Sequence, residues 1–209
     1  MSDLFVFTEA FNCGRLLIPF LDSYFQHHDE TIHIVMSKKD IEEAGSVLEN
    51  PKVVVIDVTD DQNFNRFWEH GHAGTALAFA SAIRFWGAGK KIIHFDSDVL
   101  FKQNCIDEIV EHLNNGYAAA GPMRAYKHNL GGHKQYANHP DAISTYAFGV
   151  DSTKIPEQEF SLFIQMCHGR VDPTGREVLD FFDPVTFSII DAGGKVKYLC
   201  EKDWGSTTH

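Results

Sequence analysis

The sequence predicts one α/β domain whose central sheet is mixed, mostly parallel, and flanked by helices. Short apolar runs rich in β-branched residues alternate along the chain with longer stretches of helical periodicity, which is the pattern of strands joined by crossover helices. The chain of 209 residues is also in the usual size range for one domain. No internal repeat, low-complexity tract or linker-like stretch divides it.

Three strands are predicted in the first part of the chain. They span 4–7, 32–36 and 53–58. A helix over 12–27 joins the first two, and Ser37 caps a short acidic helix that begins near Lys38. The third run is dense in β-branched residues, which favours a buried strand.

A helix is predicted over 72–86, because small and apolar residues recur there at three- and four-residue spacing, and Gly87 ends it. A fourth strand follows at 91–95. The segment 123–142 is polar and rich in Gly, His and Asn, which is typical of a long functional loop. Further strands are expected at 117–121, 145–150 and 196–200, and further helices at 104–113, 157–167 and 176–191.

The composition narrows the classes of partner. A formal net charge of −11, with 18 scattered Lys and Arg residues, argues against nucleic acid, and an anionic substrate would need a bridging cation. The N-terminus lacks the features of a signal peptide and no run is long enough for a transmembrane segment, so we expect a soluble, cytoplasmic protein. The four cysteines show no CxxC spacing, which suits free thiols.

Two carboxylates one residue apart, Asp96 and Asp98, follow the predicted strand 91–95 directly. Ligands of open α/β sheets bind beyond the carboxyl ends of the strands. The two carboxylates would repel each other unless a cation lay between them. Such oxygen ligands favour Mg²⁺ or Mn²⁺, which take further ligands from water and substrate phosphate. The pair therefore predicts a metal site for a diphosphate-bearing ligand, and the alternative is a solvated turn.

A second acidic cluster, Asp180 and Asp183, flanks two phenylalanines. In a helix over 176–191 these carboxylates, three residues apart, would share a face. The alternative is that one of them only caps a helix with Pro184 at its first position.

The order of elements, with the segments HFDSDVLF and DFFDPVTF, resembles the GT-A fold of nucleotide-sugar-dependent glycosyltransferases. The resemblance implies a single GT-A catalytic domain over 1–209, either whole or part of a longer protein. It implies a nucleotide-sugar donor, expected to be a UDP-sugar, a glycan or other hydroxyl acceptor, and Mn²⁺ or Mg²⁺ as cofactor. In that family the second acid of the DxD motif ligates the metal, so Asp98 is the main expected ligand and Asp96 its companion near sugar or ribose.

The resemblance also implies a nucleotide pocket lined from three parts of the chain. Its expected residues are Thr8, Glu9 and Asn12 after the first strand, Asp57 at the end of the third, and His72 and Thr75 near the start of the helix over 72–86. Thr8 and Asn12 could equally be turn and cap residues.

Similar transferases place an acidic residue near the acceptor hydroxyl and the anomeric carbon. Asp183, with Asp180 as the second candidate, matches that position, as general base in an inverting enzyme or as a group that positions the sugar in a retaining one. Many GT-A enzymes complete the metal shell with a histidine near the end of the domain. His209 is the residue in that position here, although the end of a chain is often disordered.

The loop over 123–142 and the segment STYAFG are expected to form the acceptor side. Charged and aromatic side chains there could bind diphosphate, acceptor hydroxyls or sugar faces, or could be a solvated loop beside core aromatics. They are Arg124, Lys127, His128, His133, Tyr126, Tyr136, Tyr146 and Phe148.

Two other functions are compatible with parts of the pattern. A phosphatase of the haloacid dehalogenase type also places an Asp-x-Asp after a hydrophobic strand, but its motif normally opens the chain and is followed by Thr or Gly, whereas Val99 follows here. A sugar-binding protein could keep the fold and lack the chemistry. Hydrolysis of nucleotide sugars in the presence of metal would separate a transferase from a binder.

Overall fold

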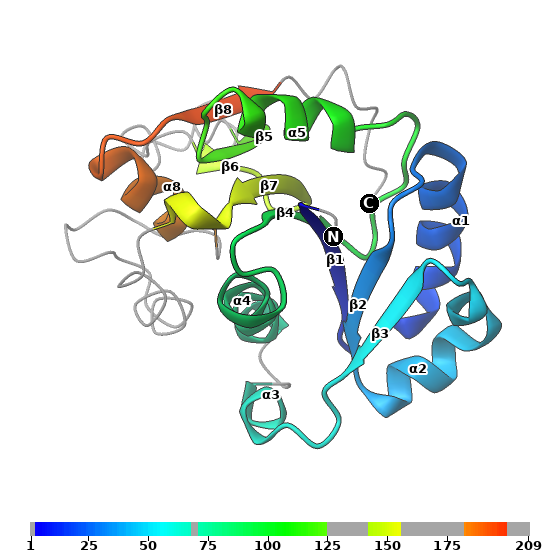
Figure 1. Cartoon of the computed structure of the whole chain (residues 1–209). Coiled ribbons are helices and arrows are strands. Elements are labelled where there is room, and N and C mark those ends of the chain that lie inside the picture. The colour runs from blue at the N-terminus through cyan, green and yellow to red at the C-terminus, as the bar shows by residue number, and fades with distance from the viewer. Residues whose placement is uncertain (1–2, 68–70, 125–141, 156–181, 200–209) are drawn as a thin grey trace, which may run out of the picture.

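The computed structural model describes residues 3–67, 71–124, 142–155 and 182–199. Within these ranges helices cover both faces of a central sheet (Figure 1). The strands are β1 (Leu4–Ala10), β2 (Ile32–Met36), β3 (Val53–Asp57), β4 (Lys91–Asp96), β5 (Ala119–Arg124), β6 (Ala142–Ile143), β7 (Ala147–Asp151) and β8 (Val196–Leu199). The helices are α1 (Leu17–His27), α2 (Lys38–Ala44), α3 (Gln62–Phe67), α4 (Gly71–Ser81), α5 (Ile106–Asn114) and α8 (Asp183–Asp191).

The sheet has eight strands in the order β3-β2-β1-β4-β7-β5-β6, with β8 paired to β5. The pairs β1–β2, β2–β3, β1–β4 and β5–β8 are parallel, and the pairs of β7 with β4 and β5, and of β5 with β6, are antiparallel. The predicted class, a mixed and mostly parallel sheet flanked by helices, is confirmed.

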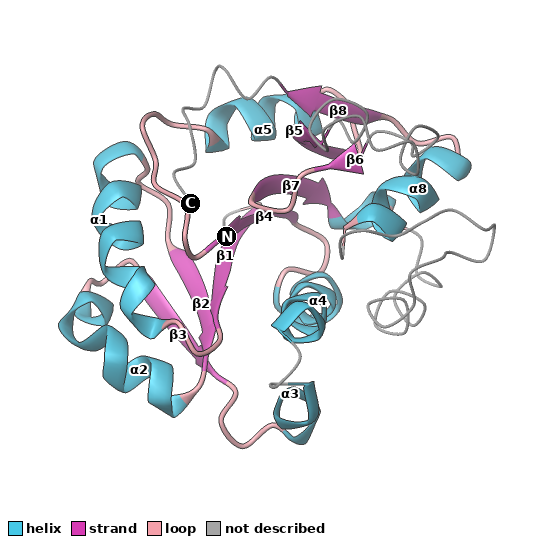
Figure 2. Ribbon diagram, turned by 180° about the vertical axis from the view of Figure 1, so that it is seen from behind, coloured by secondary structure: helices cyan, strands magenta, loops and turns pink. Residues whose placement is uncertain are grey.

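Each face of the sheet has its own hydrophobic core. On one face the α1 side chains Leu17, Phe20 and Tyr24 pack with Val6 of β1, and on the other Phe79 of α4 packs with Phe7. Figure 2 shows the same arrangement from behind, with α1 and α2 on one side of β1 to β3 and α4 on the other. The alternation of side chains along β1 therefore supplies both cores.

Four predicted elements differ from the structure. The helix expected from residue 12 begins as a 3₁₀ turn at Gly14–Leu16 and becomes α-helical at Leu17, because Asn12 has a positive φ of 60°. The third strand is the edge strand β3 and is partly exposed, so the prediction that it is buried is wrong. The helix over 72–86 ends in a π-helical turn at Ala82–Trp86.

The fourth difference concerns the start of α8. A continuous helix over 176–191 is wrong, because Phe182 is the N-cap and the helix begins at Asp183. Pro184 explains this start, since a proline ring fits the first turn of a helix and not its interior. The helix α3 was not predicted at all.

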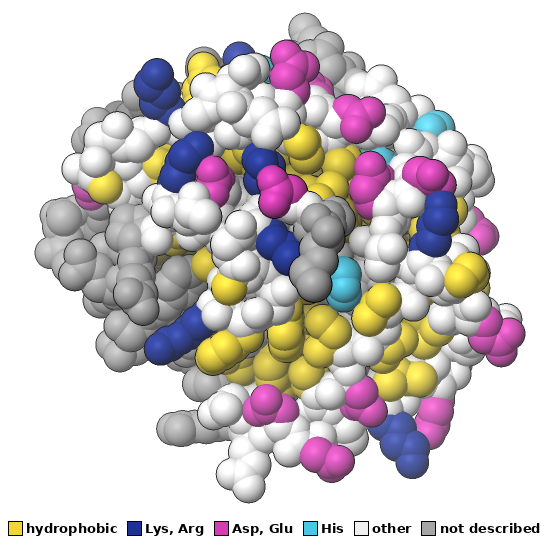
Figure 3. Space-filling model, in the orientation of Figure 1, with side chains coloured by type: hydrophobic (Ala, Val, Ile, Leu, Met, Phe, Trp, Pro, Cys, Tyr) yellow, Lys and Arg dark blue, Asp and Glu magenta, His cyan; other side chains and the backbone are white. Residues whose placement is uncertain are grey.

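Two further features are the mixture of charges on the surface and the length of the helices. On the face shown in Figure 3, Lys and Arg side chains are interspersed with Asp and Glu side chains. Among the described helices, none combines the length and the apolar character needed to cross a membrane.

His28, directly after α1, is buried in an aromatic cluster. Its ring stacks on Tyr24 with centroids 4.8 Å apart and meets Phe101 edge-on at 4.6 Å. The amide of Cys105 donates to Nε2 at 3.2 Å, so the proton of the neutral ring lies on Nδ1, which faces the Tyr24 carbonyl at 3.2 Å. Burial lowers the pKa of His28 from 6.5 to about 4.

This lowered pKa makes folding stability depend on pH. As pH falls from 6.5 toward 4, the unfolded chain takes up a proton at His28 that the folded protein does not, so stability falls. We expect the wild type to lose up to about 1.4 kcal/mol per pH unit relative to His28→Gln, which stays neutral. Urea unfolding of both proteins across this range measures the difference, and parallel curves would contradict the assignment.

Candidate functional site

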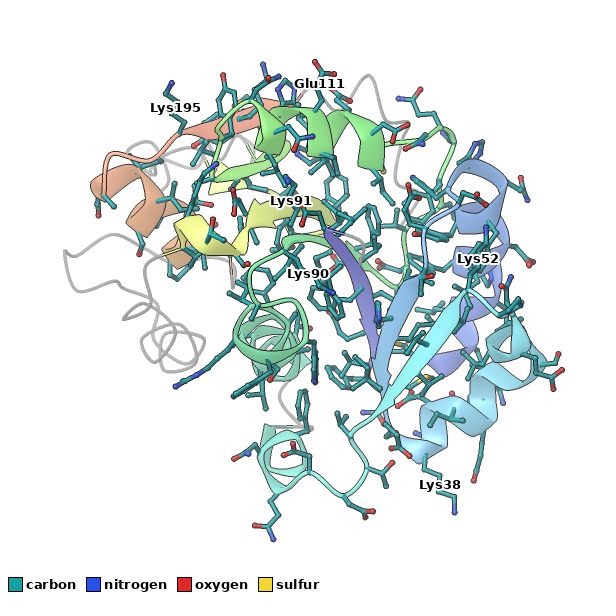
Figure 4. The ribbon with its side chains drawn as sticks, viewed as in Figure 1. Lys38, Lys52, Lys90, Lys91, Glu111 and Lys195 are labelled. Atoms are coloured by element: carbon teal, nitrogen blue, oxygen red, sulfur yellow. The ribbon has the colours of Figure 1, made fainter. Side chains whose placement is uncertain are left out.

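The carboxyl ends of β1 and β4 lie side by side where the order of the strands reverses. From β1 the chain moves outward to β2 and β3, with α1 and α2 on one face, and it returns through α4 on the other face to β4. Ligands of open α/β sheets bind at such a switch point. The register places Glu9 of β1 beside Asp96 of β4. In Figure 4, Lys38 lies beyond the end of β2, at this edge, and Lys91 lies where β4 begins.

A buried pair links Glu9 to His94 of β4. His94 is fully buried and Glu9 is 6% exposed. Nε2 of His94 lies 2.7 Å from Oε2 of Glu9, and Nδ1 lies 3.2 Å from the Thr145 carbonyl oxygen. Burial alone would lower the pKa of His94, but the charge and hydrogen bond of Glu9, with smaller contributions from Asp96 and the carbonyl, raise the pKa above its usual value. Because a carbonyl oxygen and a carboxylate oxygen accept hydrogen bonds, both ring nitrogens donate.

The DSD segment forms a turn at the end of β4. The amide of Val99 donates to the carbonyl of Asp96 at 3.3 Å, and the amide of Asp96 donates to the carbonyl of Tyr146 at 3.0 Å. The Asp96 side chain is about a third exposed and Asp98 is exposed, whereas Ser97 between them is buried. The turn thus presents its two carboxylates at the surface of the switch point.

The acidic groups at this edge have the chemistry of a site for a hard cation. Within the described ranges, one group of potential ligand atoms, from Glu9, His94 and Asp96, lies within 4.8 Å of one another. Both His94 nitrogens already have partners, so the oxygens of the carboxylates are the atoms suited to a metal ion. Asp98 is not in this group, although it belongs to the same turn.

The loop after β1 is fixed by a buried carboxylate of α2. Asp40 is fully buried, and its Oδ1 accepts hydrogen bonds from the amides of Cys13 at 2.9 Å and Gly14 at 3.1 Å. A Cβ on Gly14 would lie 2.3 Å from the backbone oxygen of Asp40, so only glycine allows this approach. Asn12 is exposed, and its Oδ1 accepts from Lys39 Nζ at 3.2 Å. The loop is therefore held firmly beside the DSD turn, where Cys13 Sγ lies 3.5 Å from Ser97 Oγ.

The other residues predicted to contact the nucleotide differ in their exposure to solvent. Thr8 is completely buried. Asp57 is exposed at the end of β3, and hydrogen bonds from the hydroxyl and amide of Thr59 lower the pKa of its carboxyl. Thr75 is half-buried on α4, and the backbone of His72 lies in the first turn of the same helix.

Asp183, the predicted catalytic acid, is fully buried at the first position of α8. Its neighbour Phe182 stacks on Phe148 with centroids 4.0 Å apart, and Phe148 lies 4.9 Å from the His94 ring. Three aromatic rings therefore connect the start of α8 to the switch point. Phe148 is fully buried in the core, which fits the alternative of a core aromatic, while Tyr146 is partly exposed.

Several predicted residues lie outside the described residues. They are Asp180, His209, Tyr126, Lys127, His128, His133 and Tyr136, together with the side chain of Arg124.

His94 was not among the predicted site residues. A signal was present, because residues 94 and 96 lie two apart in a strand and so point to the same face. A polar residue at that position within a hydrophobic strand indicates a partner at the ligand edge.

Comparison with known proteins identifies the fold. No family model and no curated protein matches the sequence. Mouse xyloside xylosyltransferase 1 in its apo form superposes with a TM-score of 0.59 at 15% identity, over 94% of this chain and 83% of that one. An active-site mutant of LgtC gives 0.63 at 13% identity, over 93% and 72%. The bifunctional glycosyltransferase WbbM gives 0.60 at 16% identity, over 94% of this chain and 38% of its own length.

At sequence identities this low, the structural similarity establishes the fold alone. The chain has the GT-A fold, as its strand order and the predicted resemblance both indicate. Function has to be argued from the site, because one fold serves several functions.

The burial of the Thr8 hydroxyl leads to a testable prediction about folding stability. Its Oγ1 is buried without a hydrogen-bond partner in the described structure, so Thr8→Val should raise the free energy of unfolding by about 1–2 kcal/mol. Thr186→Val is the matched control, since the buried Thr186 hydroxyl donates to the Phe182 carbonyl at 3.2 Å and its loss should destabilise by about 1 kcal/mol. Urea unfolding checks both, and equal losses would place a partner at Thr8.

Proposed function

We propose that this protein is a metal-dependent glycosyltransferase that moves a sugar from a nucleotide-diphosphate donor, expected to be a UDP-sugar, to a hydroxyl of a glycan or other acceptor. The observation that carries the proposal is the pairing of Glu9 and Asp96 at the switch point of a GT-A fold, directly before an exposed Asp98. The solved structures of similar fold, which are glycosyltransferases by name, support it.

The charges at the edge explain how an anionic donor is bound. Glu9 is compensated by His94, whereas Asp96 and Asp98 add negative charge where a diphosphate would lie. A divalent ion, Mn²⁺ or Mg²⁺, held by Asp98 and Asp96 would supply several kcal/mol of charge stabilisation to the leaving diphosphate. Asn12, Asp57, Thr75 and His72 are proposed to contact the nucleotide, and His209 to complete the metal shell.

The transfer itself requires a base or a stabilising carboxylate. The bond between the anomeric carbon and the diphosphate oxygen breaks, the acceptor oxygen bonds to that carbon, and the acceptor proton must leave. We assign this task to Asp183, with Asp180 as the second candidate. An inverting enzyme would use the carboxylate as general base, and a retaining enzyme would use it to stabilise the oxocarbenium-like centre.

Metal-dependent donor binding is the first test. Calorimetry with UDP and Mn²⁺ should show binding to the wild type, and Asp98→Asn or Asp96→Asn should weaken it at least tenfold, about 1.4 kcal/mol, because the cation loses an anionic ligand. EDTA should have the same effect on the wild type. Asp22→Asn, at an exposed position on α1, is the control for the loss of one negative charge.

Unchanged affinity in both DSD variants would refute the metal site. Slow hydrolysis of UDP-sugars without acceptor distinguishes a transferase from a binding protein on the same fold, which should show none. Release of phosphate from sugar phosphates without any sugar transfer would instead favour the phosphatase alternative.

Asp183 is tested by separating turnover from binding. Asp183→Asn should lower kcat about 100-fold or more, since a positioned general base contributes on that order, while the dissociation constant of UDP with Mn²⁺ stays within about twofold. Asp191→Asn, exposed at the other end of α8, is the control. Because Asp183 is buried, thermal unfolding of each variant must show that the fold is intact. A wild-type kcat in folded Asp183→Asn would remove this residue from the mechanism.

A further inference from the structure

His94 is connected to both neighbours of its own strand. Through Nε2 it donates to Oε2 of Glu9 on β1, and through Nδ1 it donates to the Thr145 carbonyl in the link between β6 and β7. The same link is tied to the turn at the end of β4 by the hydrogen bond from the Asp96 amide to the Tyr146 carbonyl at 3.0 Å. A single ring thus joins β1, β4 and the chain that enters β7.

We propose that His94 is a positioning residue for donor binding: it holds the Glu9 carboxylate at the switch point so that the second oxygen, Oε1, faces the nucleoside. This inference rests on the proposed function. It goes further, because it gives His94 an effect on donor affinity although the side chain is fully buried and does not contact the donor. Oε1 makes no hydrogen bond to the described residues, so it can accept one from a hydroxyl or N–H of the ligand.

The surroundings of the ring argue against a purely structural role. His94 lies against Phe7 and Phe148, each with its ring centroid 4.9 Å away, so a phenylalanine would fill the same space. Replacing a buried ion pair by apolar side chains is often neutral or stabilising, because the desolvation of both charges is avoided. Apolar side chains at both positions could fill this space, and what the pair adds is a fixed place for one carboxylate oxygen beside Asp96.

Three substitutions separate the two hydrogen bonds. The side-chain amide of Gln reaches the position of Nε2, and that of Asn reaches the position of Nδ1. His94→Gln can therefore keep the bond to Glu9, His94→Asn can keep the bond to Thr145, and His94→Phe keeps neither. We expect the dissociation constant of UDP with Mn²⁺ to stay within about threefold of wild type in His94→Gln and to rise about tenfold in the other two.

For each variant, calorimetry measures the affinity for UDP with Mn²⁺, and thermal unfolding measures the stability of the fold. A structural role would make affinity follow stability, whatever bond is kept, and equal affinities in His94→Gln and His94→Asn would overturn the proposal. Glu9→Gln should weaken binding as much as His94→Asn, and combining the two should add little, since both act on one oxygen. Full additivity would also overturn it.

Failure of this inference is distinguishable from failure of the proposed function. If wild-type protein binds UDP with Mn²⁺ but the His94 variants bind equally well, the transferase proposal stands and the role of His94 falls. If the wild type binds none of UDP, GDP and ADP with Mn²⁺, both fall.

Discussion

Repulsion between carboxylates at the end of two adjacent parallel strands is the constraint on which the site depends. The register of β1 with β4 brings Glu9 and Asp96 together, and the DSD turn adds Asp98. Like charges this close repel each other, and the repulsion is stronger where less water screens it. The protein compensates one of them internally with His94, buried in the same strand. The remaining negative charge is exposed, and under the proposed function a divalent cation would bridge it to the anionic donor.

Hydrogen bonds of His94 also connect the two halves of the sheet. β1 to β4 form the parallel half, and β7, antiparallel to β4, begins the mixed half. His94 bonds to both sides of this boundary, and the stacked rings of Phe148 and Phe182 continue the contact to the start of α8. Aromatic pairs of this kind contribute about 0.5–1.5 kcal/mol beyond their burial. The donor edge and Asp183 are thus parts of one packed unit.

Sequence patterns were sufficient where local chemistry decides the outcome. Hydrophobic runs gave the parallel strands, and the Asp pair after 91–95 was placed correctly at a strand end. The starts of α1 and α8 were misplaced despite the local signals of Asn12 and Pro184, whereas two other features depend on partners distant in sequence. A run of β-branched residues has the same sequence pattern at the centre and at the edge of a sheet, so the exposure of β3 could not be predicted from it. Nor could the pair of Glu9 with His94 be predicted, since these residues are 85 residues apart and meet only because β4 inserts beside β1.

The difference between a catalyst and a binding protein on this fold lies at α8. A binding protein would need only the proposed donor contacts, which come from β1 to β4, α4 and the loops between them, together with His209. Asp183 is not among those proposed contacts, and its carboxyl is fully buried at the start of α8. The partial positive charge of a helix N-terminus stabilises a carboxylate at that position. Under the proposed function this buried carboxyl, one residue from the Phe182 ring that stacks on Phe148, would act on the bound donor and acceptor, and a binding protein would not need it.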